Sequence, residues 1–362
     1  MLARHRPIVI PIPQAVVMGA CTSLPAARAG QTKEPAAEQN GPKTEHPILW
    51  QDLVEVPMLY KARSCEVPET HKRAMKLKDF LQLGELVEKV VAKYKHTDKC
   101  TGQAVRKDTV NLYHINDLIV MPLTGPCACS FMEMVSSGPQ DPVWFISHWW
   151  GTPFLDTLRM MRLHADRRHV SMCGLYWMCT FANNQHNLAE LSEPGILDTP
   201  FAKAIMSESC IGTVAFLDEE KASPFSRIWC ILEDYVTIHF GAQKKKTQLM
   251  DFCTIIPEGE CESSCGTTNP RCAGILIDNG DGTSKDNGSD LANSAAAWFP
   301  GGVSVKAVRL DVTKAQATKE NDRANILRLI RGKEDDVNLA IQTRFAPSAA
   351  YMAATDIASR EG

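Results

Sequence analysis

The chain has 362 residues, of which 44% are hydrophobic and 22% are charged, an ordinary composition for one large globular domain or two modest ones. Lys and Arg number 39 against 42 Asp and Glu, which gives a net charge of −3. The only dense basic run, Lys244 to Lys246, is short and has no aromatic residue within it, so nucleic-acid binding is not indicated.

The composition of the N-terminal 47 residues predicts a disordered leader, which could also contain a targeting signal. Residues 25–48 are rich in Ala, Gly, Pro, Gln, Lys and Glu and have no apolar period. Met18 to Ser23 has the form M-G-x-x-x-S. If translation started at Met18, Gly19 could be myristoylated and Cys21 palmitoylated, and only then would membrane contact follow. A signal-type cleavage site and a tail without an address are the alternatives.

Folded structure is expected from residue 48, beginning with an accessory helical segment over 48–130 and continuing with an α/β domain over 131–345 and a tail over 346–362. Helices are expected over 68–96, with a break near Gly84, and over 153–164, 199–208, 226–240, 322–331 and from 335. Strands are expected over 143–147, 175–181, 211–217, 249–256, 274–278 and 303–311.

This alternation of strands and helices predicts a three-layer α/β/α fold around a doubly wound, mainly parallel sheet. Residues 257–300, rich in Gly, Ser, Asn and Asp, are expected to form a loop-rich insertion. Glycines in that insertion fall where an EF-hand needs ligands, so we expect no calcium site.

The cysteines point to a reducing compartment and to no metal site. Thirteen are spread from Cys21 to Cys272, and several lie in apolar segments, as small buried residues do. The last four are separated by spacings that match no common zinc pattern. No apolar run approaches the roughly 20 residues that cross a bilayer. A cytoplasmic location is therefore expected.

Polar residues follow the expected strands, at the edge of an open parallel sheet where ligands bind. They are Ser147, His148, Trp149 and Trp150 at the end of the first strand, Asn183 and Asn184 after the second, and Asp218 at the end of the third. The next helix carries Glu233 on an otherwise apolar stretch, Ile228 to Leu232. A buried carboxylate costs several kcal/mol unless it is paired or hydrogen-bonded, so Glu233 needs a structural or a chemical reason.

Segments around these residues resemble two families of signalling domains. Phe145 to Gly151 resembles the S-x-x-W-G opening of fungal heterokaryon-incompatibility (HET) domains, and Tyr176 to Gln185 resembles their W-I-D-x-x-C-I-N-Q motif. Ser226 to Glu233 is similar to their R-x-W-x-x-Q-E motif, and Trp229-Cys230-x-x-Glu233 equally resembles the W-C-x-x-E motif of Toll-receptor-like (TIR) domains.

The resemblance covers residues 143–240 and departs from the HET pattern at Cys179 and Ala182, which stand where HET domains have Asp and Cys. It implies a flavodoxin-like topology, an intracellular signalling role and self-association. By this resemblance Glu233 matches the glutamate of catalytic TIR domains, which cleave the N-glycosidic bond of NAD. NAD is then a substrate, and no resident cofactor is expected.

The remaining candidates would bind parts of such a nucleotide. They are His148, Trp149, Trp150, Asn183, Asn184, Asp218 and Arg227. Tryptophan rings can stack on a base, and the polar side chains can bind hydroxyl or phosphate groups. No glycine-rich phosphate loop is present, which argues against a Rossmann cofactor or a nucleoside triphosphatase.

Two alternatives remain. Glu233 could pair with Arg227, and the domain would then be a non-catalytic signalling or scaffold module that acts by self-association or partner binding. A cysteine hydrolase could use Cys179 with His148 or His186, although nothing in the sequence marks Cys179 as a thiolate of lowered pKa.

Overall fold

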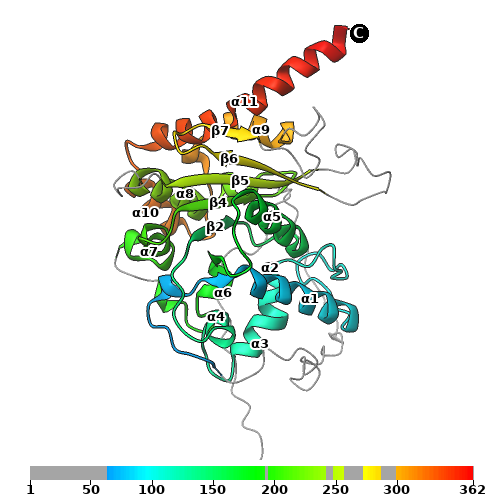
Figure 1. Cartoon of the computed structure of the whole chain (residues 1–362), viewed down its shortest axis with the longest axis vertical. Coiled ribbons are helices and arrows are strands. Elements are labelled where there is room, and N and C mark those ends of the chain that lie inside the picture. Colours follow the sequence, from blue (N-terminus) through cyan, green and yellow to red (C-terminus); the bar gives the residue numbers. More distant parts are fainter. Residues whose placement is uncertain (1–62, 192–194, 242–247, 257–271, 287–298, 362) are drawn as a thin grey trace, which may run out of the picture. The chain divides into compact units, whose positions relative to one another are not determined.

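The computed structural model describes residues 63–361, apart from 192–194, 242–247, 257–271 and 287–298 (Figure 1). The expected leader, the alternative start at Met18 and most of the 257–300 insertion lie outside the described residues. Within the described part of the chain, no helix combines the length and the apolar character that crossing a membrane requires.

A seven-stranded sheet forms the centre of the fold, with the strand order β1-β3-β2-β4-β5-β6-β7. The strands are β1 (Met75–Lys76), β2 (Trp144–His148), β3 (Leu175–Trp177), β4 (Gly212–Leu217), β5 (Leu249–Ile256), β6 (Cys272–Asp278) and β7 (Ser284–Asp286). The four central strands β3, β2, β4 and β5 are parallel, whereas β1, β6 and β7 pair antiparallel at the two edges. The expected α/β class is confirmed, but the sheet is mixed rather than mainly parallel.

Eleven α-helices accompany this sheet in the described residues. They are α1 (Leu77–Lys93), α2 (Leu112–Ile115), α3 (Met121–Thr124), α4 (Phe131–Val135), α5 (Phe154–Arg167), α6 (Cys179–Ala182), α7 (Pro200–Met206), α8 (Ile228–Gly241), α9 (Gly301–Val308), α10 (Glu320–Leu329) and α11 (Glu334–Glu361). A π-helical turn, η3 (Asn116–Val120), joins α2 to α3, and 3-10 turns are η2 (Thr70–Lys72), η4 (Leu188–Leu191), η5 (Ile196–Asp198), η6 (Ser223–Ser226) and η7 (Val312–Lys314).

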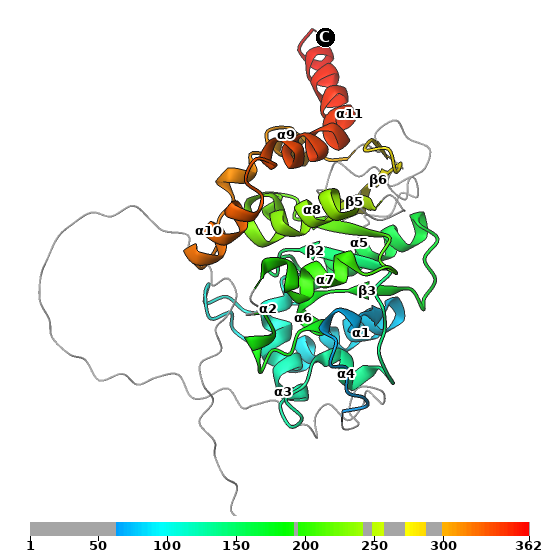
Figure 2. The ribbon, with the colours of Figure 1, turned by 90° about the vertical axis from the view of Figure 1, so that its left-hand side faces the viewer.

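Helices cover both faces of the sheet (Figure 1). On one face, Val214 and Phe216 of β4 belong to the apolar cluster that also contains side chains of α1 and α5. On the other face, the hydroxyl of Thr213 in β4 lies 2.7 Å from that of Thr237 in α8. Because neighbouring strand residues point to opposite faces, α5 and α8 lie on opposite sides. Beyond α8, α11 packs against both α8 and α9 (Figure 2).

The segment before β2 also belongs to this core. Its strand β1 pairs with β3 at the edge of the sheet. Phe181 of α6 lies at the centre of an aromatic group, with ring centroids 5.7, 5.5 and 6.3 Å from those of Phe80, Phe131 and Phe154. The edge strand and this aromatic group therefore join α1, α4, α5 and α6 into one apolar interior.

Two expected strands differ from the structure. The strand expected over 303–311 is wrong, because residues 301–308 form α9. Its valines mimic the alternation of a strand, but the buried residues Val303 and Ala307 are four apart, as on a helix face. The strand expected over 175–181 ends at Trp177, and α6 begins at Cys179.

The break expected near Gly84 is also wrong, because α1 runs through it. A Cβ at Gly84 would lie 2.4 Å from Cδ1 of Leu158 in α5, so this glycine permits the close approach of two helices. The helix expected from residue 335 is α11, and it continues to Glu361 through the segment over 346–362 that was expected to be a tail.

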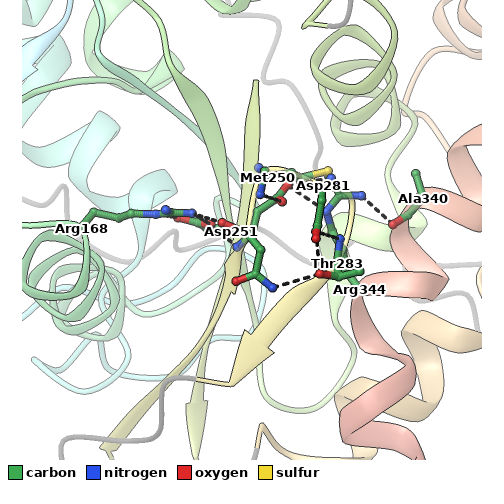
Figure 3. A network of polar contacts seen from close by, with 10 residues as sticks. Arg168, Met250, Asp251, Asp281, Thr283, Ala340 and Arg344 are labelled. Carbon is green, nitrogen blue, oxygen red and sulfur yellow. Dashed lines mark hydrogen bonds and ion pairs between the residues drawn. The ribbon is translucent and has the colours of Figure 1, made fainter. Parts of the chain in front are cut away.

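A buried ionic network ties α5 and α11 to the sheet (Figure 3). Arg168 donates two hydrogen bonds to Asp251 of β5, at 2.7 and 2.6 Å. Arg344 of α11 donates to Asp278 at the end of β6, at 2.7 Å. Burial alone would raise the pKa of Asp251, but hydrogen bonds from Arg168 and His164 lower it below its ordinary value. The network lies at the amino end of β5, and it therefore leaves the opposite edge of the parallel strands for other chemistry.

Candidate functional site

The candidate site lies at the carboxyl ends of the parallel strands β3, β2 and β4. The chain passes from β2 through α5 to β3 on one side of β2, and it later enters β4 on the other side. This reversal makes the end of β2 a topological switch point, where loops diverge and open α/β sheets bind their ligands.

Glu233 is held at this point by β2. The side chain lies in the second turn of α8 and is 6% exposed. The hydroxyl of Ser147 donates a hydrogen bond of 2.5 Å to its Oε2 atom. Ser147 was expected only as one of several polar residues at a strand end. Neighbouring residues of a strand face opposite sides of the sheet, and Ile146 faces α5, so Ser147 faces α8. This alternation is visible in the sequence and could have paired Ser147 with Glu233.

The carboxyl group of Glu233 is mostly protonated at neutral pH in this environment. Burial raises its pKa to about 8, and the nearby charge of Asp234 adds to that rise. The hydrogen bond from Ser147 and the charge of Arg227 act in the opposite direction but do not cancel it. The group can therefore ionise within the physiological range when a cation approaches.

Arg227 does not neutralise Glu233 by direct contact. Within the described part of the chain, its half-buried guanidinium forms neither a hydrogen bond nor an ion pair. Its charge still lowers the pKa of Glu233 and of His148. The ion pair considered as an alternative for Glu233 is thus not formed among these residues, and a cationic side chain remains next to the carboxyl group.

His148 and Cys179 form a neutral pair beside Glu233. Nδ1 of His148 lies 3.2 Å from the carbonyl oxygen of Ile146, and Nε2 lies 3.9 Å from Sγ of Cys179. Burial lowers the pKa of His148 to about 4 and raises that of Cys179 to about 12. The indole N–H of Trp150 donates to the same sulfur at 3.3 Å.

These protonation states do not suit a cysteine hydrolase. A nucleophilic cysteine needs a lowered pKa and a base that can accept its proton, and neither is present at Cys179. His186 takes no part either, because its Nε2 atom lies 2.8 Å from the hydroxyl of Thr124. These pKa values do not favour the alternative of a Cys179 hydrolase, which stays an untested prediction.

The two tryptophans have different surroundings. The ring of Trp149 lies against the backbone of Gly151, where a Cβ atom would be 2.3 Å from Cζ2. Trp150 packs against Tyr113, with ring centroids 5.4 Å apart. Both rings are half-buried. Trp150 is held through its ring and its N–H, whereas Trp149 packs on the turn after β2.

Two expected ligand residues are engaged by the fold. The side chain of Asn184 donates to the carbonyl of Ala128 at 2.7 Å and accepts from the backbone of His186 at 3.0 Å. The carboxylate of Asp218 accepts backbone N–H groups of Lys221 and Ser223, at 2.7 and 2.5 Å. Both side chains fix turns, and neither lies free to meet a ligand.

Asn183 differs from them. It is 2% exposed, and its Oδ1 atom has no hydrogen-bond partner among the described residues. The hydroxyl of Thr152, in the turn between β2 and α5, is in the same situation. Thr152 is not among the residues predicted from the sequence, because a single threonine in a polar turn carries no pattern that would identify it.

The described residues contain no group of three or more His, Cys, Asp or Glu side chains that could hold a metal ion. Of the four cysteines considered for zinc, Cys253 is buried in β5, and Cys261 and Cys265 lie outside the described residues. Cys272 is disulfide-bonded, a pairing that the expectation of reduced thiols did not include.

Comparisons with protein-family models, curated proteins and solved structures found no match to this chain. The functional inference therefore rests on the chemistry of the site. Around the end of β2, an α/β protein brings together a carboxyl group that can ionise, an arginine free of ion pairs among the described residues, and buried neutral groups. Such a set suits a ligand with cationic, anionic and hydroxyl parts.

Proposed function

We propose that the protein is an intracellular TIR-like or HET-like signalling enzyme that hydrolyses the N-glycosidic bond of NAD or a related nucleotide. Glu233 is the essential carboxylate in this proposal. The observation that carries it is the position of Glu233 at the switch point, hydrogen-bonded to Ser147 and not paired with Arg227 among the described residues.

The order of the parallel strands supports the proposal. When only β2, β3, β4 and β5 are counted, in chain order, their order in the sheet is 2-1-3-4. Flavodoxin-like sheets begin with the same order and bind their ligand at the corresponding switch point. The W-C-x-x-E segment opens α8, which places its glutamate against β2.

The chemistry requires one well-placed carboxylate. Nicotinamide in NAD is a cationic leaving group, so the bond from its nitrogen to C1′ can break without a general acid, and the electron pair leaves with neutral nicotinamide. Water then adds to C1′ and loses a proton to solvent. A carboxylate next to C1′ stabilises the positive charge of the oxocarbenium-like transition state. The approach of the cationic ring favours ionisation of Glu233.

The remaining side chains would bind and orient the nucleotide. Arg227 carries the positive charge that suits a phosphate group, and Trp149 offers a ring next to the end of β2. His148 is uncharged at neutral pH, because its pKa is lowered to about 4, and it can exchange hydrogen bonds only as a neutral imidazole. Asn184 and Asp218 are not in this set, because their side chains hold turns.

A non-catalytic module that acts by self-association is the second candidate. It is favoured by the burial of Glu233, whose protonated carboxyl and hydrogen bond to Ser147 are already compatible with a packed interior. Membrane contact would require acylation of Gly19 after a start at Met18, and both residues lie outside the described part of the chain.

One experiment separates the two candidates. Purified protein, alone and deliberately clustered, is incubated with NAD, and the release of nicotinamide is measured for the parent, Glu233→Ala and Asp234→Asn. The enzyme proposal expects release by the parent and by Asp234→Asn, which removes a neighbouring buried carboxyl group, and none by Glu233→Ala. No release from clustered, folded parent protein would overturn the enzyme, and release that survives Glu233→Ala would overturn the assignment of Glu233.

A further inference from the structure

Asn183 is the buried member of a run of four polar side chains, and the described residues leave its side-chain oxygen without a partner. Asn184 and Gln185 donate to backbone carbonyls at 2.7 and 3.0 Å. His186 lies 2.8 Å from the hydroxyl of Thr124. Oδ1 of Asn183 has no partner among the described residues, although the side chain is fully enclosed.

Thr152 is an equally unusual threonine. It is 3% exposed, and its hydroxyl has no partner in the part of the chain that the structure describes. Most other buried threonines bond within the fold, as Thr213 and Thr237 do to each other at 2.7 Å and Thr254 does to a backbone carbonyl at 3.0 Å. The hydroxyl of Thr180, in the helix just before Asn183, also has no partner among the described residues. The hydroxyl of Thr152 therefore has no comparable role in holding the structure together.

The two orphaned groups belong to one region. Thr152 follows β2 by four residues, and Asn183 follows the short helix after β3, the parallel neighbour of β2. Their loops are joined at Cys179, whose sulfur accepts from Trp150 at 3.3 Å and whose carbonyl accepts from the backbone N–H of Asn183 at 3.1 Å. Both groups thus lie on the side of β2 where the loops of β2 and β3 meet.

A buried polar atom without a partner costs folding free energy, about 1–3 kcal/mol, so such atoms usually meet a ligand or an ordered water. An amide oxygen accepts a hydrogen bond, and a hydroxyl can donate or accept one. Neither group is charged, and an amide oxygen repels phosphate. The matching ligand group must donate a hydrogen bond to Asn183, and a neutral hydroxyl, which can both donate and accept, suits both side chains.

We propose that Asn183 and Thr152 bind ribose hydroxyl groups of the nucleotide substrate and so select for an intact ribose. This inference rests on the proposed function for the identity of the ligand as a ribonucleotide. The new elements are a role in ligand recognition for Thr152 and, for Asn183, a specific role in binding the hydroxyl groups of ribose.

Binding is tested in the Glu233→Gln background, in which turnover is not expected. Calorimetry gives the Kd of NAD, nicotinamide riboside and adenosine for this protein and for its Asn183→Leu and Thr152→Val derivatives. Each derivative should raise the Kd about tenfold, as expected for one lost hydrogen bond. The two nucleosides show which of the two riboses of NAD is bound.

Melting temperature without ligand distinguishes recognition from a structural role. Loss of an orphaned polar group should leave the Tm of Asn183→Leu and Thr152→Val unchanged or higher. The matched control is Thr254→Val, which removes a buried hydroxyl that is bonded at 3.0 Å and should lower Tm without changing any Kd. A lowered Tm with unchanged Kd in Thr152→Val and Asn183→Leu would assign the two groups to a buried water and overturn the inference.

The inference and the proposed function can fail separately. Ribonucleotide binding that depends on Asn183 and Thr152, without release of nicotinamide by the parent protein, would overturn the enzyme and leave the ribose site. Release of nicotinamide with an unchanged KM in both variants would overturn the ribose site alone. Failure of all three probes to bind would also overturn it.

Discussion

Ser147 of β2 and Glu233 of α8 are joined by a 2.5 Å hydrogen bond that crosses from the sheet to the helix. This bond opposes the burial that raises the pKa of Glu233 to about 8. The bond therefore affects both the stability of the fold and the protonation of Glu233, and removing the hydroxyl of Ser147 should change both.

Ser147→Ala should lower the free energy of unfolding by about 1–3 kcal/mol, because a buried carboxyl group loses its hydrogen-bond donor. Loss of the same bond raises the pKa of Glu233 further. If ionised Glu233 is the catalytic form, nicotinamide release rises with pH, and its midpoint should move from near 8 to a higher pH in the variant. Urea denaturation and a pH-rate profile measure the two changes.

The control is Ser147→Thr, which keeps a hydroxyl at the same position and should retain the pH profile of the parent. An unchanged profile in Ser147→Ala, at a rate high enough to measure, would mean that the ionisation of Glu233 does not limit the reaction.

The buried carboxyl group of Asp234 should make the folded protein less stable as pH rises. Burial raises its pKa from 3.8 to about 8, so between these values the native state holds a proton that the unfolded state has released. Stability must then fall with increasing pH, by up to about 1.4 kcal/mol per pH unit for such a group. Asp234→Asn should remove the part of the slope that Asp234 contributes and make the protein more stable than the parent at pH 8, but not at pH 4.

Chemical denaturation at pH 4, 6 and 8 measures the slope. Glu233→Gln should reduce it over nearly the same range, because the pKa of Glu233 is raised from 4.5 to about 8, and the double variant should show both reductions. Parallel slopes in the parent and Asp234→Asn would show that Asp234 is ionised in the native protein.

The sequence predicted the central elements well, because their patterns are local. Runs of apolar residues bounded by polar turns identify β2, β4 and β5, and helical spacing identifies α5 and α8. The direction of β6 is not a local property, since the same apolar run fits either direction of pairing. The valines of α9 resemble a strand until their burial, four residues apart, is known.

The site was also predicted only in part, because some of its features follow from local sequence patterns and others depend on distant residues. The position of Glu233 on an apolar helix indicated a buried carboxyl group, and burial is confirmed. The role of Asn184 depends on Ala128, 56 residues earlier in the chain, and no local pattern separates a turn-forming asparagine from one that binds a ligand. The TIR-like or HET-like relationship and the cleavage of NAD stay predictions.

Arg168 should contribute strongly to stability, because Asp251 is 0% exposed and cannot be solvated if its partner is removed. Arg168→Ala should lower the free energy of unfolding by about 3–5 kcal/mol, the usual cost of breaking a buried ion pair. The matched control is Arg106→Ala, whose ion pair with Asp108 at 3.0 Å is mostly exposed and should change stability little. Equal effects of the two substitutions in urea denaturation would show that Asp251 regains solvent when Arg168 is lost.

Gly84→Ala should destabilise the protein although alanine is the better helix former by about 1 kcal/mol. The added Cβ would lie 2.4 Å from Cδ1 of the buried Leu158, and overpacking of this kind costs about 1–3 kcal/mol. In Gly302→Ala, the control, the Cβ on α9 meets nothing within 4 Å and should leave stability unchanged or higher.

A double-mutant cycle tests whether the contact with Leu158 is the cause. Leu158→Val shortens that side chain, so adding Gly84→Ala to it should cost less than adding Gly84→Ala to the parent, and the difference should exceed the ~0.5 kcal/mol expected of independent sites. Free energies of unfolding of the four proteins give this coupling directly. If Gly84→Ala costs the same in both backgrounds, the approach of α1 to α5 is limited by another contact, and the absence of a side chain at residue 84 does not set the distance between the two helices.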